Sequence, residues 1–568
     1  MINNIIIPET LQPIAAILAY YLEPLLAWFS HYICQQLVAR RPDHPLIRIA
    51  QLLDFAVLER ACASYHDSAS PRGRPVTHTV PRLLRLLFIK YWSDLSLRQL
   101  EERLRYDLLV RWFVGYGLHQ ETPDHTTLHR FEVYLYQQHP GLFFSHVLNQ
   151  IDATLDDGHE QVQIADTFAL RANAALESLL QRLRHSSYLL LQAWQEATPV
   201  AYAAIESQLD GAALFGLKTE KRDCFLSQDE WRQRLLLTVQ AIEDGLALLP
   251  VAEPCPASVQ LYRQQLHKIL ADELSISRDA DGRAAAVALL PAAKRGHFRL
   301  CSATDPDATI RNHGKGKIDF GFNISITATP DFIREICADT GSTSDVTPIP
   351  DLLTAQAERG HTLPQKLIYD QIAGTGKTAH EVTLVSHGRT QLVAKPMPPK
   401  KSRALGPDVF VLSDDGFTLT CPHSRLSCHR YRSGEGDGWT FRFMPAQCLG
   451  CPLLKECRGK LETPTTHRDV FISEYRLDFD RQRAYSQTDE FKEEMKLRPQ
   501  VERLIAGVVL HNGARYARFR GLPKVDFQAK MCAMAYNAKR WLVLLAEKEG
   551  RARRPVRRRW ELPPVSQG

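Results

Sequence analysis

The stretch QVQIADTFAL (161–170) contains a short apolar run that ends at Asp166. A second run of this kind, QKLIYD (365–370), ends at Asp370. Both patterns are typical of a short buried strand followed by a polar residue. Glu502 lies in a third segment, where apolar residues recur at helical spacing from Arg498 onward. Carboxylates at strand ends and on a facing helix can converge in space, so these three acids form the first candidate site.

Three converging carboxylates offer the hard oxygen ligands that Mg²⁺ or Mn²⁺ prefers. Two such ions about 3.5–4 Å apart can activate an attacking oxygen and stabilise a leaving one at a phosphodiester. The spacing alone does not establish a metal site, because many triples of acids can be chosen from the 64 acidic residues of the chain. An aspartate after an apolar run is most often a turn or cap residue.

The neighbouring segments indicate a mixed sheet with flanking helices, in the α+β or α/β class. GFNISITAT (321–329) and FIREICADT (332–340) predict a strand pair joined at Pro330, and RTQLVAK (389–395) predicts another strand. Residues 346–359 predict a connecting helix. Helical patterns cover the remaining long segments, and we expect an all-α N-terminal domain and a helical insertion at 176–295. Residues 396–465 are expected to be irregular.

The N-terminal half divides at DSASPRGRPVTHTVP (67–81), a linker by its Ser, Pro and Gly content. Residues 1–66 form a helical extension before it, and a compact helical unit follows at 82–150. Ser96 and Gln99 predict a capping box, and Thr122 before Pro123 predicts another helix start. Basic residues interleave with the apolar pattern of this unit, including Arg98 and Arg103. They fit either a solvated helix face or a phosphate-contacting face.

Five of the 12 cysteines cluster between Cys421 and Cys457. Cys448 and Cys451 form a C-x-x-C pair, and four thiolates of this kind suit tetrahedral structural zinc: Cys421, Cys448, Cys451 and Cys457. Cys428, His423 and His429 are possible substitutes. The alternative is that these cysteines are reduced and bind no metal. Reduced cysteines are expected in the cytoplasm, and the seven scattered cysteines also fit that compartment.

The run AGTGKT (373–378) resembles the end of a phosphate-binding loop. The first glycine of the full motif would fall at position 371, which is glutamine, so ATP binding is not expected. The C-terminal segment instead indicates binding to a polyanion. Residues 498–550 hold ten Lys and Arg against four acids, and the tail at 551–568 adds six arginines. Three arginines of GARYARFRGLPK (513–524) are candidate nucleic-acid contacts: Arg515, Arg518 and Arg520. For the basic tail at 546–568, a disordered segment that only increases solubility remains the alternative.

The composition is that of an ordinary globular protein. In 568 residues, 44% are hydrophobic and 24% charged, which excludes wholesale disorder, and the net charge is +6. The first ten residues carry no Lys or Arg, so no export signal is evident. The most apolar stretch, residues 11–30, contains Pro13, Glu23 and Pro24, each costly in a membrane span. We expect a buried helical pair or a dimerisation element there, and no membrane partner.

Five separate blocks, in a fixed order, resemble the DDE transposases of bacterial insertion sequences. The first two are LLRLLFIKYWSDLSLRQLEERLRYDLLVRWFVGY (83–116) with TPDHTTLHRF (122–131), and QIADTFALRANA (163–174). DPDATIRNHGKGKIDFGFNISI (305–326) and KLIYDQIAGTG (366–376) follow. The last is RPQVERLIAGVVLHNGARYARFRGLPKVDFQAKMCAMAYNAKRW (498–541), and CLGCPLLKEC (448–457) is a feature of one branch.

The resemblance implies an RNase H-like catalytic domain over residues 151–545, with Asp166, Asp370 and Glu502 as its acidic triad. It also implies that the helical unit at 82–150 binds the terminal inverted repeats. The expected reaction is Mg²⁺- or Mn²⁺-dependent strand cleavage at transposon ends, followed by transfer of the 3′-hydroxyl into target DNA. The family's tyrosine and lysine near the glutamate are Met495 and Val509 here, whereas Arg498 fits its position. Its spacing permits Arg498 either to pair with Glu502 one turn away or to contact DNA.

The expected partners are double-stranded DNA, at the transposon ends and at the target, and a second copy of the chain during synapsis. The expected location is the cytoplasm, on the nucleoid. Two other functions remain open: a stand-alone nuclease with the same core, and a decayed or domesticated transposase that only binds DNA.

Overall fold

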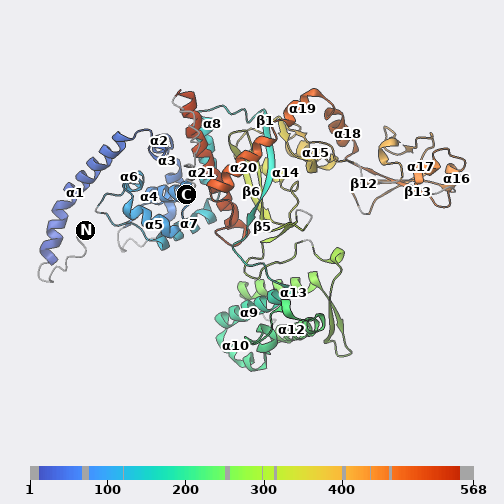
Figure 1. The fold of residues 1–568 in the computed structure, drawn as a ribbon, viewed down its shortest axis with the longest axis horizontal. Helices are drawn as coiled ribbons and strands as arrows, with labels where there is room; N and C mark the ends of the chain where they lie inside the picture. The colour runs from blue at the N-terminus through green and yellow to red at the C-terminus, as the bar shows by residue number, and fades with distance from the viewer. Residues whose placement is uncertain are drawn as a thin grey trace, which may run out of the picture.

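The structure is a computed structural model that describes nine segments of the chain: residues 12–66, 76–118, 120–249, 256–296, 298–312, 316–398, 404–434, 436–459 and 464–550. It has a mixed sheet at its centre, helices on the N-terminal side, and two excursions that leave the sheet in different directions (Figure 1). The sequence-based expectation of a mixed sheet with flanking helices after an all-α region is confirmed. The basic tail at 551–568 and the start of the chain at 1–11 lie outside the described residues.

The N-terminal region is entirely helical where it is described. It consists of α1 (Gln12–Arg40), α2 (Pro45–Leu52), α3 (Ala56–Ala61), α4 (Val80–Trp92), α5 (Leu97–Tyr106), α6 (Leu108–Val114), α7 (His125–Gln138) and α8 (Leu142–Asp152). The predicted capping box of Ser96 and Gln99 is present at the start of α5. The predicted start at Thr122 is wrong. The helix begins at His125, because the Asp124 carboxylate accepts the free backbone N–H of Thr127 at 2.8 Å.

The central sheet has six strands, and β5 is paired on both edges. The order is β4-β5-β1-β7-β8, and β6 pairs with β5 beyond the end of β4. The β5–β1 pair is antiparallel, whereas β1, β7 and β8 are parallel. The strands are β1 (Val162–Arg171), β4 (Thr309–Asn312), β5 (Ile318–Ala328), β6 (Ile333–Thr340), β7 (Lys366–Ile368) and β8 (Gln391–Val393). The predicted pair around Pro330 is the β5–β6 pair.

Helices from the C-terminal half cover the sheet, together with α14 (Ile349–Glu358) and α15 (Gly376–Val385). The others are α18 (Arg476–Tyr485), α19 (Asp489–Met495), α20 (Pro499–His511) and α21 (Leu522–Lys548). The long helix α21 lies between the N-terminal helices and the sheet (Figure 1). Apolar side chains of α4, α8, β5, β6, α20 and α21 belong to one buried cluster. The helical region therefore shares its core with the sheet, which positions the two rigidly.

The first excursion, after β1, has its own hydrophobic core. Its helices are α9 (Leu179–Ala197), α10 (Pro199–Ile205), α11 (Gly211–Phe215), α12 (Gln228–Leu248) and α13 (Ala257–Glu273). The prediction of helix throughout this segment is wrong at its end. There β2 (Leu274–Arg278) and β3 (Ala284–Leu289) form an antiparallel hairpin. The exposed and buried residues of this hairpin do not alternate regularly, so the strand pattern was weak in the sequence.

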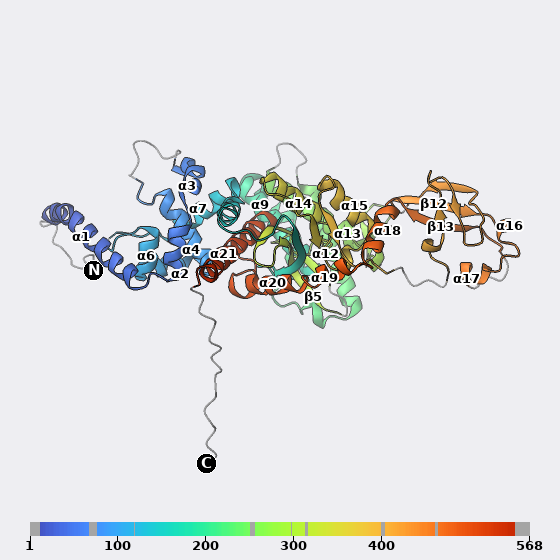
Figure 2. The ribbon, with the colours of Figure 1, turned by 90° about the horizontal axis from the view of Figure 1, so that it is seen from above.

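The second excursion holds the clustered cysteines and lies at the far end from α1 (Figure 2). The expectation that residues 396–465 are irregular is wrong, because these residues include strands and two short helices. The elements are β9 (Val411–Leu412), β10 (Leu419–Thr420), β11 (His429–Arg432), β12 (Gly438–Phe443), α16 (Pro445–Cys448), α17 (Leu454–Arg458) and β13 (Arg468–Ser473). Strands β11, β12 and β13 form a separate sheet over a small core.

The apolar stretch at 11–30 falls within α1 except for its first residue. No helix in the described part of the chain combines the length and hydropathy needed to cross a membrane.

Candidate active site

Asp166 lies on β1, and Asp370 lies two residues beyond the end of the neighbouring parallel strand β7. Ile164 of β1 is opposite Ile368 of β7, and each aspartate follows two residues later. Because side chains alternate along a strand, Asp166 lies on the same face as Ile164. Asp370, two residues past Ile368, lies close enough to raise the pKa of the Asp166 carboxyl. Both isoleucines belong to the cluster that also contains α20 and α21. Asp166 therefore lies on the sheet face that these helices cover.

Glu502 reaches this face from α20. Its side chain is 64% exposed, whereas that of Asp166 is 19% exposed. Arg498 lies one turn before Glu502 and links the two acids, at 3.3 Å from Glu502 Oε1 and 3.9 Å from Asp166 Oδ2. The structure thus brings Arg498 and the acids at 166 and 502 together.

The local charges perturb Asp166. Burial raises the pKa of the Asp166 carboxyl, and the nearby carboxylates of Asp370 and Glu502 raise it further. The backbone N–H of Thr167, which donates to Asp166 Oδ1 at 2.8 Å, and the Arg498 guanidinium oppose this rise. A partly buried acid with two acidic neighbours fits a divalent cation, which would relieve the repulsion.

The three carboxylates do not form one compact cluster. The structure contains a group of three potential ligands within 4.8 Å of one another elsewhere, but Asp166, Asp370 and Glu502 do not meet that distance. Asp370 caps the short 3-10 helix at Gln371–Ala373, where its Oδ1 accepts from Ile372 N–H at 3.0 Å. This wider spacing is better suited to carboxylates that bind two metal ions between them than to a site that encloses a single ion.

A cavity of about 490 Å³ opens beside Asp166 and Glu502. Four ionisable side chains besides these acids line it: Arg171, Arg311, Asp319 and Arg515. Its remaining wall is apolar and comes largely from α20, including Val509. The cavity therefore has two of the three acids, Asp166 and Glu502, beside three arginines, which suits a phosphodiester held next to metal-binding carboxylates.

Sequence reasoning missed Arg311, which lies on the edge strand β4. Its guanidinium donates to Thr167 Oγ1 at 2.9 Å and to Asp345 Oδ2 at 3.1 Å. It also donates to the fully buried Asn323, whose amide in turn donates to Asp345 at 3.0 Å. Arg311 thus holds the residue next to Asp166. The only signal for it was its place in the block 305–326, which matched the family without assigning a role.

The other predicted arginines have different surroundings. Arg98 and Arg103 are exposed on α5, and Arg103 pairs with Asp107 at 3.1 Å. Arg515 is exposed at the cavity, and the Nε of Arg520 donates to the Asn173 carbonyl at 2.9 Å. Arg518 differs, because its guanidinium binds Asp94 and the Leu95 carbonyl in the turn before α5. These contacts join the loop before α21 to the helical region, and the DNA contact of Arg518 stays a prediction.

The four cysteines predicted to bind zinc surround one small cavity of about 30 Å³: Cys421, Cys448, Cys451 and Cys457. Two tight turns carry three of them, with Ser424 and Gly450 in the left-handed conformation, and Arg425 N–H donates to Cys421 Sγ at 3.3 Å. Burial and the nearby Cys448 raise the pKa of Cys457. No three of these sulfur atoms lie within 4.8 Å of one another. The donor set fits zinc, but its geometry is looser than a closed tetrahedral site.

The run AGTGKT serves packing. A Cβ on Gly374 would lie 1.9 Å from the Lys395 carbonyl oxygen, and one on Gly376 would lie 2.3 Å from that of Tyr475. Thr375 caps α15 through its side chain. These glycines allow close backbone approach, as expected where a side chain would clash.

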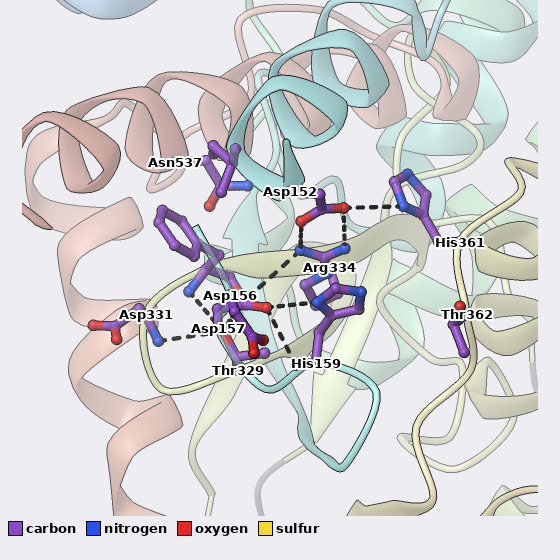
Figure 3. Close-up of polar contacts among 12 residues, drawn as sticks. Asp152, Asp156, Asp157, His159, Thr329, Asp331, Arg334, His361, Thr362 and Asn537 are labelled. Carbon is purple, nitrogen blue, oxygen red and sulfur yellow. Dashed lines mark hydrogen bonds and ion pairs between the residues drawn. The ribbon is translucent and has the colours of Figure 1, made fainter. Parts of the chain in front are cut away.

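The compact group of potential ligands is Asp152, Asp157 and His159, at the entry to β1. Figure 3 shows the Arg334 guanidinium among them, and its side chain is fully buried. Arg334 donates to both oxygens of Asp152 at 2.7 Å and lies 3.6 Å from Asp157. Asp157 also accepts from Thr329 at 2.8 Å. A cation already occupies the centre of this group, so it is an ion-pair network and not a metal site.

Two family models match the chain. One, described as a transposase domain of the DUF772 type, matches residues 35–133, and the other, a transposase DDE domain, matches residues 420–542. The first match runs from α1 to α7, and the second contains Glu502 but neither aspartate. No curated protein matches, and neither does any solved structure.

Proposed function

Because the chain belongs to the DDE transposases of insertion sequences, we propose that it cuts DNA at the ends of a mobile element and joins the freed ends to target DNA. One observation supports this proposal most directly: Asp166 on β1 lies near both Asp370, just past the end of the adjacent parallel strand β7, and Glu502 on α20. The family uses divalent metal, and the donor set here consists of hard carboxylate oxygens.

In the proposed site, Asp166 and Asp370 hold Mg²⁺ or Mn²⁺ and Glu502 completes the ligand set. The bound metal would polarise the phosphoryl group and raise the acidity of the attacking hydroxyl. In the first reaction a water oxygen bonds to phosphorus, and the P–O3′ bond breaks to leave a 3′-hydroxyl and a 5′-phosphate. In the second, that 3′-oxygen bonds to a target phosphorus and displaces a target 3′-hydroxyl. Neither reaction needs a covalent protein intermediate.

The chain's own side chains orient and neutralise the DNA in this scheme. The Arg498 guanidinium lies within ion-pair distance of both Asp166 and Glu502 and would offset part of their charge. Arg171 and Arg515 line the cavity and would face the phosphate backbone. Arg515 is the candidate to replace the contact that the family's lysine makes, since Val509 forms apolar wall instead. Arg98 and Arg103 on α5 are proposed to contact the terminal repeats.

We further propose that the four clustered cysteines bind a structural zinc ion, which would fasten a segment with a small core. The whole protein is proposed to act on the nucleoid in the cytoplasm, with two copies pairing the two ends.

The test is a cleavage and joining assay on duplexes that carry the element's flanking ends, with Mg²⁺. Wild type is expected to release a 3′-hydroxyl and to join it to target DNA. Asp370→Asn should abolish both steps and retain DNA binding, and Asp319→Asn serves as a matched carboxylate control at the cavity wall. Wild type that binds the ends without cutting them would favour a decayed, DNA-binding protein. Cutting without joining would favour a stand-alone nuclease.

A further inference from the structure

Helix α1 projects from the helical region (Figures 1 and 2). Several of its large apolar side chains are exposed in the described chain. Its buried side rests against α6, where Ser30 and Cys34 are covered and Ser30 Oγ accepts the Leu118 N–H at 3.1 Å. The rest of its described surface carries six large apolar residues that are 38–65% exposed: Leu22, Leu25, Leu26, Trp28, Phe29 and Tyr32. We call these six residues the α1 face.

The spacing of the α1 face is that of a helix–helix seam. Leu22, Leu25, Phe29 and Tyr32 follow one another at intervals of three, four and three residues, which is the a/d pattern of packed helices. Trp28 and Tyr32 stack with ring centroids 5.7 Å apart and so present a broad ridge beside this seam. Soluble monomers rarely expose contiguous apolar patches of this kind without a partner.

The chemistry of the face selects against DNA. Between residues 12 and 39 the chain has no Lys or Arg and a single acid, Glu23. The one arginine of α1, Arg40, lies eight residues beyond Tyr32, so the α1 face itself offers no lysine or arginine to a phosphate backbone. Both family matches begin beyond the face, at residues 35 and 420, so neither assigns it a role.

A second copy of the same helix supplies a matching surface. A large side chain has about 200 Å² of accessible surface, so the exposed fractions of the six residues amount to roughly 600 Å² per copy. Two copies would bury roughly 1,200 Å² in total, which reaches the lower limit of specific interfaces. An identical face on each copy is also what a two-fold axis requires.

We propose that the α1 face is a homodimer interface, in which α1 of one copy packs on α1 of another through Leu22, Leu25, Phe29 and Tyr32. This inference rests on the proposed function in one respect, since joining two ends calls for two copies. The physical claim about the interface does not depend on catalysis.

The test measures the mass of the full-length protein by light scattering after gel filtration, free and with saturating end duplex. Wild type is expected at twice the 64.5 kDa chain mass. Leu25→Glu/Phe29→Glu should elute as a monomer, because the change places four carboxylates in the seam. The matched control is Val200→Glu/Leu477→Glu, which alters two exposed residues on other helices and should stay dimeric.

A second measurement needs no substitution. Amide hydrogen exchange at residues 22–32 of wild type should slow as protein concentration rises, while α5 should not respond. In the end-joining assay, the seam variant should bind one duplex within about twofold of wild type but lose concerted joining of two ends by about tenfold or more.

Wild type that is monomeric both free and on DNA would overturn the interface, as would a seam variant that remains dimeric. Binding of wild type to phosphatidylcholine vesicles, lost in the seam variant, would assign the face to a lipid surface instead and would also overturn it. These outcomes are separate from the proposed function, because a dimer that does not cut leaves the interface standing. A monomer that cuts and joins ends refutes the interface alone.

Discussion

Arg334→Met is expected to be the most destabilising single substitution of a charged residue outside the active site. The fully buried guanidinium makes two 2.7 Å hydrogen bonds to Asp152 and lies 3.6 Å from Asp157. Methionine fills a similar volume but leaves two carboxylates without their cation. Removing one partner of a buried ion pair costs about 3–5 kcal/mol, so we expect a loss of that size at pH 7.

The pKa shifts of Asp152 and Asp157 predict how the Arg334→Met loss of stability changes with pH. Burial alone would raise the pKa of Asp152, but hydrogen bonds from Arg334 and His361 hold that pKa well below its ordinary range. Burial would likewise raise the pKa of Asp157, and His159 with Arg334 lowers it. Groups with depressed folded pKa values contribute stability above their unfolded pKa of about 4 and lose it as the pH falls. The Arg334→Met penalty should therefore be largest near neutrality and shrink below about pH 4.

The assay is urea unfolding followed by tryptophan fluorescence, with Trp541 as the nearby reporter. Its indole N–H donates to Thr154 at 2.9 Å, close to Asp152. The matched control is Arg283→Met, which removes an exposed pair with Asp244 and should cost at most about 1 kcal/mol. Asp152→Asn in the Arg334→Met background should recover part of the loss. The reasoning is refuted if Arg334→Met unfolds within about 1 kcal/mol of that control at pH 7.

Three further predictions concern the proposed sites. Arg311→Gln should slow cleavage by about 100-fold through misplacement of the strand that carries Asp166, while filter binding of end DNA stays unchanged; equal losses in both would contradict it. Arg498→Gln removes a cation that lowers the pKa of Asp166, so the acid limb of the pH–rate profile should move to higher pH, and an unmoved limb would count against the pairing. Cys451→Ser should lower the zinc content measured by atomic absorption, whereas Cys224→Ser should retain it; full zinc in the first variant would exclude this ligand.

Local chemistry made several elements predictable from the sequence. The capping box at Ser96 needs only residues three apart, and it is present. The β5–β6 pair, the strand that carries Asp166 and the strand that precedes Asp370 follow from short apolar runs bounded by turn residues. The parallel β1–β7 pairing then brought the aspartates near each other, although 204 positions separate Asp166 from Asp370 in the chain.

Other features depend on tertiary contacts and left no local signal. Arg311 looked like any strand arginine, because its partners come from three other segments of the chain. Arg518 lay in a basic aromatic run that favoured DNA, yet its partner Asp94 is 424 positions away. The β2–β3 hairpin was hidden in a leucine- and alanine-rich stretch whose residues also suit a helix. The cysteine segment was predicted as irregular because its strands are short.

The two excursions leave the acidic site intact because each leaves and re-enters the sheet region at neighbouring points. The Glu177 N–H donates to the Cys301 carbonyl at 3.1 Å, and the Glu177 carboxylate accepts from Ala303 N–H at 2.9 Å. These bonds close the neck of the first excursion, six residues after Arg171, which lines the active-site cavity. Since the excursion has its own core, its length adds little strain to the sheet. Because only six residues separate this neck from Arg171 in the active-site cavity, we expect the excursion and the catalytic face to contact the same duplex.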